Sequence, residues 1–374
     1  MILSTLDLLL LTQIPGIGSH RLRALIQHFR DPQAVAAAAA RQLIQVQGIE
    51  RKTALAIVTF FRSGAASAAR REAERQLQHL RKIGGRIVTF WDEDYPSNLR
   101  RIYDPPPLLF VKGSFREIDD SSIAVVGTRR PTPYGSLIAE RFAGELVSHG
   151  LTVVSGLARG IDTIAHTAAL RAGGRTIAVI GSGLDIIYPA ENRMLAETIA
   201  VQGVLLSEHE MGAKPDAVNF PRRNRIISGI ALGTLVVETG IEGGAMITAS
   251  IALDQNREVF AIPSALSDRR VSGTNRLIKG GKALLTESVD DIISELGPRL
   301  KRILGSGRIA TQPPIEDLSL FERSVYDAMD DQPSHIDQIA ARTGFAVADA
   351  LVHLLSLEFK GLVVQRAGKM FVRI

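Results

Sequence analysis

The chain has 374 residues, of which 45% are hydrophobic, and this length predicts two or three domains with a sizeable core. It contains no cysteine, which excludes disulfide bonds, thiolate catalysis and cysteine zinc sites, and it has no apolar run long enough to span a membrane. We therefore expect a cytoplasmic protein without a membrane partner. The formal charge is +5, but residues 315–374 carry six Lys/Arg against nine Asp/Glu, so the residues before them carry +8. A polyanionic partner is expected to bind upstream of residue 315.

Residues 1–75 are predicted to form an all-helical domain around two similar segments. Ile14–Ile26 and Val46–Ile57 each place a Gly-Ile turn before a helix, and residues 70–82 continue as a charged helix. The pair resembles the SAM-like double helix-hairpin-helix module, in which backbone amides of the turn can hold a DNA phosphate. The second turn has Glu50 where that motif prefers glycine, and a packing module without a ligand is the alternative interpretation.

Residues 85–296 are predicted to form an α/β domain with an extended Rossmann-like, doubly wound and mainly parallel sheet. Apolar runs such as Ile123–Val126 are typical of strands buried on both faces, which require helices on both sides of the sheet. Asp104–Phe110 (DPPPLLF) is predicted to be a rigid entry segment. Strands are predicted at Arg86–Thr89, Ile123–Val126, Thr152–Ser155, Thr176–Ile180, Val204–Ser207, Thr234–Glu238 and Glu258–Ile262, and helices at Tyr134–His149, Ile161–Ala172, Glu191–Val201, Pro221–Ala231 and Ala245–Gln255.

The stretch Asn219–Leu253 is predicted to run helix, strand, glycine turn, helix. Pro221 suits a first helical position, and Gly233 can end that helix. Arg223 falls on the apolar stripe of the helix, so it is expected to point inward toward the sheet edge, where a buried charge needs an anionic partner. An ion pair with Glu238 or Glu242 is the alternative interpretation. Arg225 is expected to point nearly the opposite way.

Common cofactor and metal motifs are absent, so no cofactor and no metal ion are expected. Neither Lys282 nor Lys369 is followed by the Ser or Thr of a phosphate-binding loop, and Ile186 replaces the third glycine of a dinucleotide fingerprint after Gly181-Ser182-Gly183. The eight histidines show no ligand spacing. His166 lies one helical turn after Asp162. The two side chains are expected to form either a catalytic pair or a hydrogen bond on the helix surface.

Glycine-bearing turns follow the predicted strands, at the sheet edge where ligands bind in open α/β folds. Several of these turns also carry arginine or lysine, which predicts an electropositive cleft, and Tyr134, Tyr188 and Phe220 are near enough in sequence to stack on bases. Positive charge with aromatic rings is typical of single-strand binding. The turns supply as candidate DNA-binding residues Gly127, Thr128, Arg129, Arg130, Arg159, Gly181, Ser182, Gly183, Arg222 and Lys279.

Residues 297–314 are predicted to be a linker, rich in Gly, Pro and Arg, and residues 315–374 a winged-helix-like domain. Three helices precede a hairpin with Ala367-Gly368 at its turn. A DNA-reading winged helix has a basic third helix, whereas this one carries Asp349, His353 and Glu358 with one lysine, Lys360. A role in protein contact or modulation is favoured over groove reading.

Five segments carry a specific resemblance to a known family: Val126–Gly135, Val153–His166, Phe220–Gly229, Leu235–Ala249 and Ser272–Leu285. They resemble the DprA (Smf) family of DNA-processing proteins in natural transformation, over roughly Trp91 to Ile293. The resemblance implies a homodimer that binds single-stranded DNA in a positive pocket, protects incoming DNA and loads RecA onto it, without being an enzyme; single-strand-binding protein is a further candidate partner. By motif, Arg129, Phe220, Arg223 and Arg225 become pocket residues. Many relatives have a lysine a few residues before the phenylalanine; here Asp216, Ala217 and Val218 occupy that span, and the nearest lysine is Lys214.

Two other functions remain open at this stage. The segment around Glu238 loosely resembles the glycine turn of phosphoribohydrolases of the lysine-decarboxylase-like class, in which Glu238 would be the general acid/base. That motif's first glycines are replaced by Ile230-Ala231-Leu232. A pure protein scaffold is the third interpretation, and it leaves the arginine-bearing turns unexplained.

Overall fold

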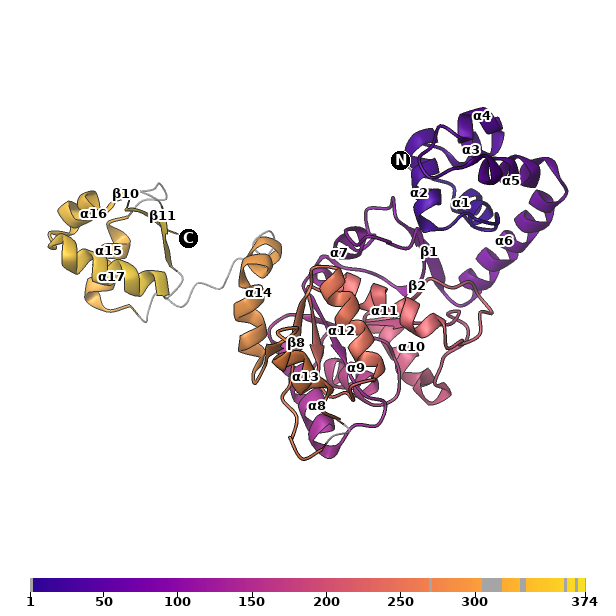
Figure 1. Ribbon diagram of the computed structural model, residues 1–374. Helices are drawn as coiled ribbons and strands as arrows, with labels where there is room; N and C mark the ends of the chain where they lie inside the picture. The colour runs from indigo at the N-terminus through magenta and orange to yellow at the C-terminus, as the bar shows by residue number, and fades with distance from the viewer. Residues whose placement is uncertain are drawn as a thin grey trace. The chain divides into compact units, whose positions relative to one another are not determined.

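The computed structural model describes residues 3–268, 271–304, 318–329, 334–359, 362–366 and 369–373. The chain divides into two compact units, Met1–Leu304 and Gly305–Ile374 (Figure 1). The first unit contains a helical module and a sheet domain, and the second is a small domain of helices around a three-stranded sheet.

The N-terminal module confirms the predicted SAM-like pair of turns. Gly16 and Gly48 have φ angles of +85° and +82°, which glycine adopts without strain. Arg21 donates from Nε to the Gly48 carbonyl (3.0 Å) and from Nη1 to the Gly16 carbonyl (2.7 Å), so one side chain holds both turns together. The helices are α1 (Thr5–Thr12), α2 (Ser19–Phe29), α3 (Pro32–Ala37), α4 (Ala40–Leu43), α5 (Arg51–Arg62) and α6 (Ala65–Lys82).

Where the structure describes it, the sheet domain has nine strands in the order β1-β2-β6-β5-β4-β3-β7-β8-β9. Strand β2 pairs antiparallel with β1 and β6, and the other pairs are parallel, which confirms the predicted mainly parallel sheet. The strands are β1 (Gly85–Thr89), β2 (Leu108–Gly113), β3 (Ser122–Val126), β4 (Thr152–Ser155), β5 (Thr176–Ile180), β6 (Val204–Ser207), β7 (Gly233–Val236), β8 (Glu258–Ala261) and β9 (Leu284–Leu285).

Helices cover both faces of this sheet, as a doubly wound fold requires (Figure 1). On one face α11 and α12 pack against strand residues such as Val154 and Val236; on the other, α8, α9 and α14 pack against Ile123 and Val153. The helical module shares a core with α10 and the β2–β6–β5 end of the sheet. The helices are α7 (Ser97–Arg100), α8 (Pro133–Ser148), α9 (Ile161–Arg171), α10 (Arg193–Gln202), α11 (Asn219–Ile230), α12 (Gly244–Asp254), α13 (Gly273–Lys279) and α14 (Val289–Leu304).

Four local predictions were wrong. The segment predicted as a rigid entry ends inside a strand, because Leu108–Gly113 forms β2 and buries Leu109 and Val111. Helix α11 begins two residues before Pro221, and Gly233 starts β7 instead of ending α11. Helix α10 begins at Arg193, after a short 3₁₀ turn over Ala190–Asn192.

The C-terminal unit confirms the winged-helix prediction. Strands β11 and β12 pair antiparallel as the hairpin, and β10 pairs with β12. The hairpin turn at 367–368 and residues 305–314 of the predicted linker lie outside the described residues, while α14 extends to residue 304. The elements are α15 (Leu320–Asp327), β10 (Ser334–His335), α16 (Ile336–Thr343), α17 (Val347–Phe359), β11 (Val363–Arg366) and β12 (Met370–Arg373).

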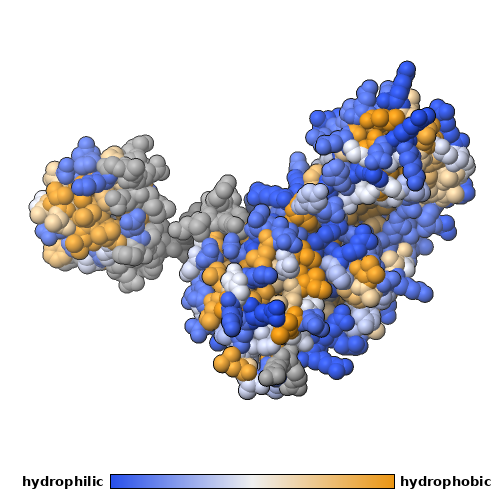
Figure 2. Space-filling model, in the orientation of Figure 1, coloured by the Kyte–Doolittle hydropathy of each residue, from blue (hydrophilic) through white to orange (hydrophobic). Residues whose placement is uncertain are grey.

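Helix α17 gives this unit an apolar surface. Figure 2 shows hydrophobic side chains over α15 and α17, where Phe321 is 59% exposed and Val352 63% exposed. Across the described residues no single helix is long and apolar enough to span a membrane; α16 and α17 reach that length only as a pair bent by 105°. Ile339 and Leu354, one from each helix of the pair, are buried in the core of the winged helix.

Candidate nucleic-acid interface

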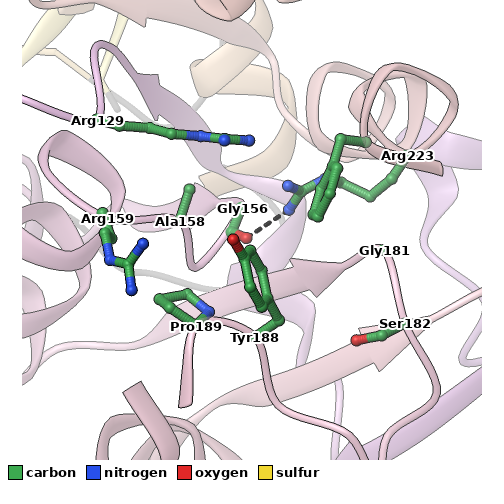
Figure 3. A pocket seen from close by; sticks show the side chains of 10 residues that line it. Arg129, Gly156, Ala158, Arg159, Gly181, Ser182, Tyr188, Pro189 and Arg223 are labelled. Atoms are coloured by element: carbon green, nitrogen blue, oxygen red, sulfur yellow. Dashed lines mark hydrogen bonds between the residues drawn. The ribbon is translucent and has the colours of Figure 1, made fainter. Parts of the chain in front are cut away.

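A pocket lies at the carboxyl ends of β3, β4 and β5, under the first turns of α11 (Figure 3). Its position agrees with the expected ligand edge of an open α/β sheet. The loop after β3, the loop after β4, the segment after β5 and α11 each contribute to its wall. The lining residues are Arg129, Gly156, Ala158, Arg159, Gly181, Ser182, Tyr188, Pro189, Phe220 and Arg223.

Two glycines let the loops after β3 and β4 pass against each other. Gly160 has a φ of +77°, and a Cβ on it would lie 2.4 Å from the Thr128 carbonyl oxygen. A Cβ on Gly127 would lie 2.4 Å from a side-chain carbon of Ile161. The Ile161 amide donates to the Thr128 carbonyl (3.2 Å) and completes this junction. The close fit fixes where the next residue, Arg129, leaves the sheet edge.

The crevice between β3 and β7, where the strand order reverses, is filled by Glu238. Its carboxylate accepts hydrogen bonds from the amide (2.9 Å) and the hydroxyl (2.5 Å) of Thr132, the N-cap residue of α8. Its backbone carbonyl accepts from the Thr128 amide (2.7 Å). Glu238 is 2% exposed. The open space therefore lies over β3, β4 and β5 and not at the switch point itself.

Arg223 points inward, as its place on the helical stripe predicts, and is 5% exposed. Its partners are not Glu238 or Glu242: Nη1 donates to the carbonyl oxygens of Gly156 (2.5 Å) and Val179. Burial lowers the pKa of Arg223 to about 10, and nearby Asp162 raises it, so the guanidinium stays charged at neutral pH.

Asp162 holds the same loop from the other side. Its Oδ2 accepts from the amides of Gly156 (3.1 Å) and Ala158 (3.2 Å). Burial raises the pKa of the Asp162 carboxyl, and the charge of Arg223 lowers it. A Cβ on Gly156 would lie 2.3 Å from Nη1 of Arg223 and 2.7 Å from Oδ2 of Asp162. This charge pair shapes the pocket floor, and only glycine fits between its members.

Arg129 and two aromatic rings form the exposed rim. The Arg129 guanidinium lies 5.5 Å from the centre of the Phe220 ring, and the centres of the Tyr188 and Phe220 rings lie 5.9 Å apart. Arg129 is exposed and Tyr188 is 41% exposed. Within the described residues Arg129 has no acidic partner. A cation and stackable rings thus lie together at the mouth, which suits a strand with phosphates and bases.

Comparisons with known proteins agree with this fold. Family models match in chain order: SAM-like helix-hairpin-helix tandem at residues 8–63, DNA recombination-mediator protein A at 86–297 and DprA winged helix domain at 310–369. Protein Smf from Synechocystis sp. is 35% identical over 97% of both chains. The chain belongs to the DprA (Smf) family.

Two solved structures of the family are similar to this chain. DprA from Streptococcus pneumoniae has a TM-score of 0.67 and 32% identity, covering 79% of this chain and 99% of that one. DNA processing protein A from Helicobacter pylori, described for its single-stranded DNA binding mode, has a TM-score of 0.52 and 30% identity, covering 57% and 96%.

Not every residue expected in a DprA pocket lies in this one. Arg225, expected to point away from the pocket, is only partly exposed and pairs with Glu208 and, at 3.9 Å, with Asp104. Gly183 is buried beside the Glu210 carbonyl, and Lys279 lies at the end of α13, which packs near β8. The other residues outside the lining are Gly127, Thr128, Arg130, Arg222 and Lys214.

Arg159 lines the pocket but is already paired. Its Nε and Nη2 donate to the Glu191 carboxylate at 2.7 and 2.8 Å. The hydrogen bond to Glu191 raises the pKa of Arg159, and the same bond lowers the pKa of Glu191. Both groups are exposed, so solvent screens this pair and a phosphate can compete for the arginine.

His166 belongs to the core and forms no pair with Asp162. It is fully buried, against the expected position on the helix surface, and its Nδ1 lies 2.6 Å from the Thr176 hydroxyl. Burial lowers its pKa to about 3, with a smaller contribution from Arg223. Within the described residues no three His, Asp or Glu side chains gather as a metal-ligand group.

Sequence reasoning missed Gly156, Ala158 and Pro189 as lining residues. Gly156 and Ala158 lie inside the glycine turn after β4. The sequence predicts that this turn belongs to the cleft, but it does not indicate which residues of the turn line the pocket. Pro189 follows Tyr188 through a cis peptide bond, and no local pattern marks it as part of the wall. The free volume between these side chains is about 20 Å³, room for about one water molecule.

Proposed function

We propose that this protein binds single-stranded DNA across the pocket mouth and processes incoming DNA in transformation. Arg129 contacts a backbone phosphate, Phe220 and Tyr188 stack on bases, and Arg223 holds the pocket floor from below. The observation that carries the proposal is the exposed guanidinium of Arg129, which lies 5.5 Å from the centre of the partly exposed Phe220 ring and has no acidic partner in the described residues. The Helicobacter pylori relative, described by its single-stranded DNA binding mode, supports the same ligand.

The small free volume supports a strand lying over the mouth, with bases entering only as Phe220 and Arg129 move. Pockets that enclose small ligands usually have about 300–1,000 Å³, far more than the 20 Å³ free here. Duplex DNA offers no exposed base faces to these rings. We therefore expect preference for single strands with little sequence preference.

Competition binding tests this proposal. Fluorescence polarisation of a labelled oligothymidylate is measured while unlabelled single strand or duplex of the same length is added at matched salt. The single strand should compete at a lower concentration than the duplex. Equal competition by the two would contradict the proposed ligand.

We propose no catalytic activity for this site. The carboxylate that would serve a phosphoribohydrolase, that of Glu238, is occupied by Thr132 and buried. Purified protein incubated with AMP is expected to release no adenine. Adenine release that disappears in Glu238→Gln would reverse this assignment.

We further propose that the protein acts in the cytoplasm as a homodimer and loads RecA, with single-strand-binding protein as an additional partner. Family membership supports these proposals. Light scattering should give twice the chain mass of 40.5 kDa. On single strands coated with single-strand-binding protein, adding this protein should shorten the lag of RecA ATP hydrolysis. A monomeric mass would contradict the proposed homodimer, and an unchanged lag would contradict the proposed loading of RecA.

A further inference from the structure

A second groove, of about 460 Å³, lies between helix α2 and the segment after β1. Arg23, Ile26, Gln27 and Arg30 line it from α2 and its C-cap, at the helical spacing of one face. Phe90 and Trp91 form the opposite wall. The groove thus lies between the helical module and the sheet domain, close to α7, which carries Arg100 next to Phe90.

Cations and rings lie close together at this groove. The guanidiniums of Arg23, in the lining, and of Arg100, in α7, lie 5.6 Å and 5.8 Å from the centre of the Phe90 ring. Trp91 meets Phe90 edge to face at 5.6 Å between ring centres. This combination matches the composition of single-strand-binding surfaces, in which charge follows the backbone and rings stack on bases.

One of these cations, Arg23, has a structural role. Arg23 donates to the carbonyls of Pro105 (2.5 Å) and Tyr103 (3.4 Å) and lies 3.7 Å from the Asp104 carboxylate. Its side chain is 16% exposed, and burial lowers its pKa. Arg23 therefore ties α2 to the loop after α7 and gives the groove a fixed wall.

Two other residues at the groove have no such structural role. Tyr103 does not line the groove, but Arg23 donates to its backbone carbonyl, so its loop borders the groove, and Tyr103 is 94% exposed. Within the described residues Arg30 has no acidic partner. An exposed ring and an unpaired cation beside a rigid wall are what an arriving strand would need, and a joint between modules requires neither.

Asp104 connects this groove to the first pocket. Its carboxylate lies 3.7 Å from Arg23 and 3.9 Å from Arg225, which is five residues after Phe220 on α11. Five helical residues rise about 7.5 Å. Arg222, two residues after Phe220 on the same helix, is exposed.

We propose that the α2–β1 groove is a second single-strand site, which holds the DNA that leaves the pocket over α11. This proposal rests on the proposed function for its ligand, single-stranded DNA, but assigns a different surface to it. Arg30 contacts a phosphate, and Tyr103 and Trp91 stack on bases. Longer strands then bind more tightly than strands that fill the pocket alone.

Trp91 is the only tryptophan in the chain, so its fluorescence reports on the groove directly. Oligothymidylates from about 4 to about 16 nucleotides, the site sizes of single-strand-binding folds, are titrated while Trp91 emission and the polarisation of a labelled strand are recorded. Short strands should bind without changing Trp91 emission, and longer strands should quench it as affinity rises. Tight binding of long strands with unchanged emission would overturn the proposal.

Two variants separate stacking from charge. Tyr103→Ala should weaken only the long strands, on the order of tenfold. Arg30→Gln should flatten their slope of log affinity against log salt by roughly 0.7. Arg171→Gln removes an exposed arginine paired with Glu140 at the far end of α9 and is the matched control.

The same data distinguish failure of the groove from failure of the pocket. Equal long-strand affinity in Tyr103→Ala, Arg30→Gln and the control would refute the groove and leave the pocket standing. If Arg129→Ala leaves the affinity of every length unchanged while Trp91 quenching persists, the pocket assignment fails and the groove assignment holds.

Discussion

Arg129 and Arg223 line the same pocket, but only one of them can meet a phosphate without breaking the fold. Arg129 is exposed, and its guanidinium lies 5.5 Å from the centre of the Phe220 ring. Arg223 is 5% exposed, and its Nη1 is already bound to the carbonyls of Gly156 and Val179. Two arginines predicted for one role therefore have different proposed roles: Arg129 contacts the ligand, and Arg223 positions the loops of the pocket floor.

This difference predicts opposite outcomes for the two alanine variants. Arg129→Ala should keep the wild-type melting temperature and flatten the single-strand salt slope by roughly 0.7, one lost phosphate contact. Arg223→Ala should lower the free energy of unfolding by on the order of 2–4 kcal/mol, because it leaves buried carbonyls and Asp162 without their partner. Thermal unfolding and polarisation at several salt concentrations measure both. An Arg129→Ala protein with wild-type affinity and slope would refute the contact.

Phe220→Ala distinguishes base stacking from packing in the core. The ring is partly exposed between Arg129 and Tyr188. Its loss should weaken single-strand binding by on the order of 1–3 kcal/mol with an unchanged salt slope, because no counterion is released by stacking. A variant that instead loses thermal stability together with binding would show that the ring serves the core.

His166 predicts how stability depends on pH. Its folded-state pKa of about 3 lies below the value of about 6.5 expected for an unfolded chain. As the pH falls, His166 is therefore protonated in the unfolded chain before it is protonated in the folded one. Its contribution to the free energy of unfolding is fully present above pH 6.5 and is lost as the pH falls toward 3. At pH 5 this loss is roughly 2 kcal/mol.

A comparison with His166→Asn isolates this effect, because the other titrating groups are shared. Urea unfolding followed by Trp91 emission at pH 8 and pH 5 gives the free energy of unfolding of each protein. The wild type should lose about 2 kcal/mol more than His166→Asn over this interval. An equal loss in the two proteins would show that His166 does not drive the dependence.

At the scale of elements, periodicity and β-branched runs identified most of the central strands and helices, because those signals are local. Strand β2 was missed because the prolines of Asp104–Pro107 indicate a rigid, irregular segment. The pairing of β2 with β6, which lies nearly a hundred residues later in the chain, produces no pattern in the local sequence. The turns that build the pocket were recognisable from glycine and arginine. The partners of Arg223 and Glu238 were not, since each is supplied by a distant loop.

Glu238 joins the end of β7 to the start of α8 and gives a prediction for that junction. Glu238→Gln replaces a carboxylate that accepts two hydrogen bonds from Thr132 by an amide whose NH₂ cannot accept one. We expect a loss of on the order of 1–3 kcal/mol in the free energy of unfolding, with single-strand affinity within about twofold of wild type. Unchanged stability together with a lost activity on a nucleotide would favour a catalytic role for this residue.

At the scale of the whole molecule, charge separates the two units. Residues 315–374 carry net −3 and the preceding residues +8. On α17 the exposed side chains include Val347, Val352 and Leu355, an apolar surface suited to a protein and not to a phosphate backbone. Both the pocket and the α2–β1 groove belong to the first unit.

Removal of Ile315–Ile374 should therefore leave single-strand binding nearly intact. The deleted residues belong to a unit with its own core, so the first unit should keep its fold. Affinity for single strands should stay within about twofold and the salt slope should not change, because no phosphate contact is lost. Polarisation measures both, with Trp91 emission and melting temperature as controls for the fold. A folded, truncated protein that binds more than tenfold more weakly would place essential DNA contacts in the winged helix, against the charge distribution.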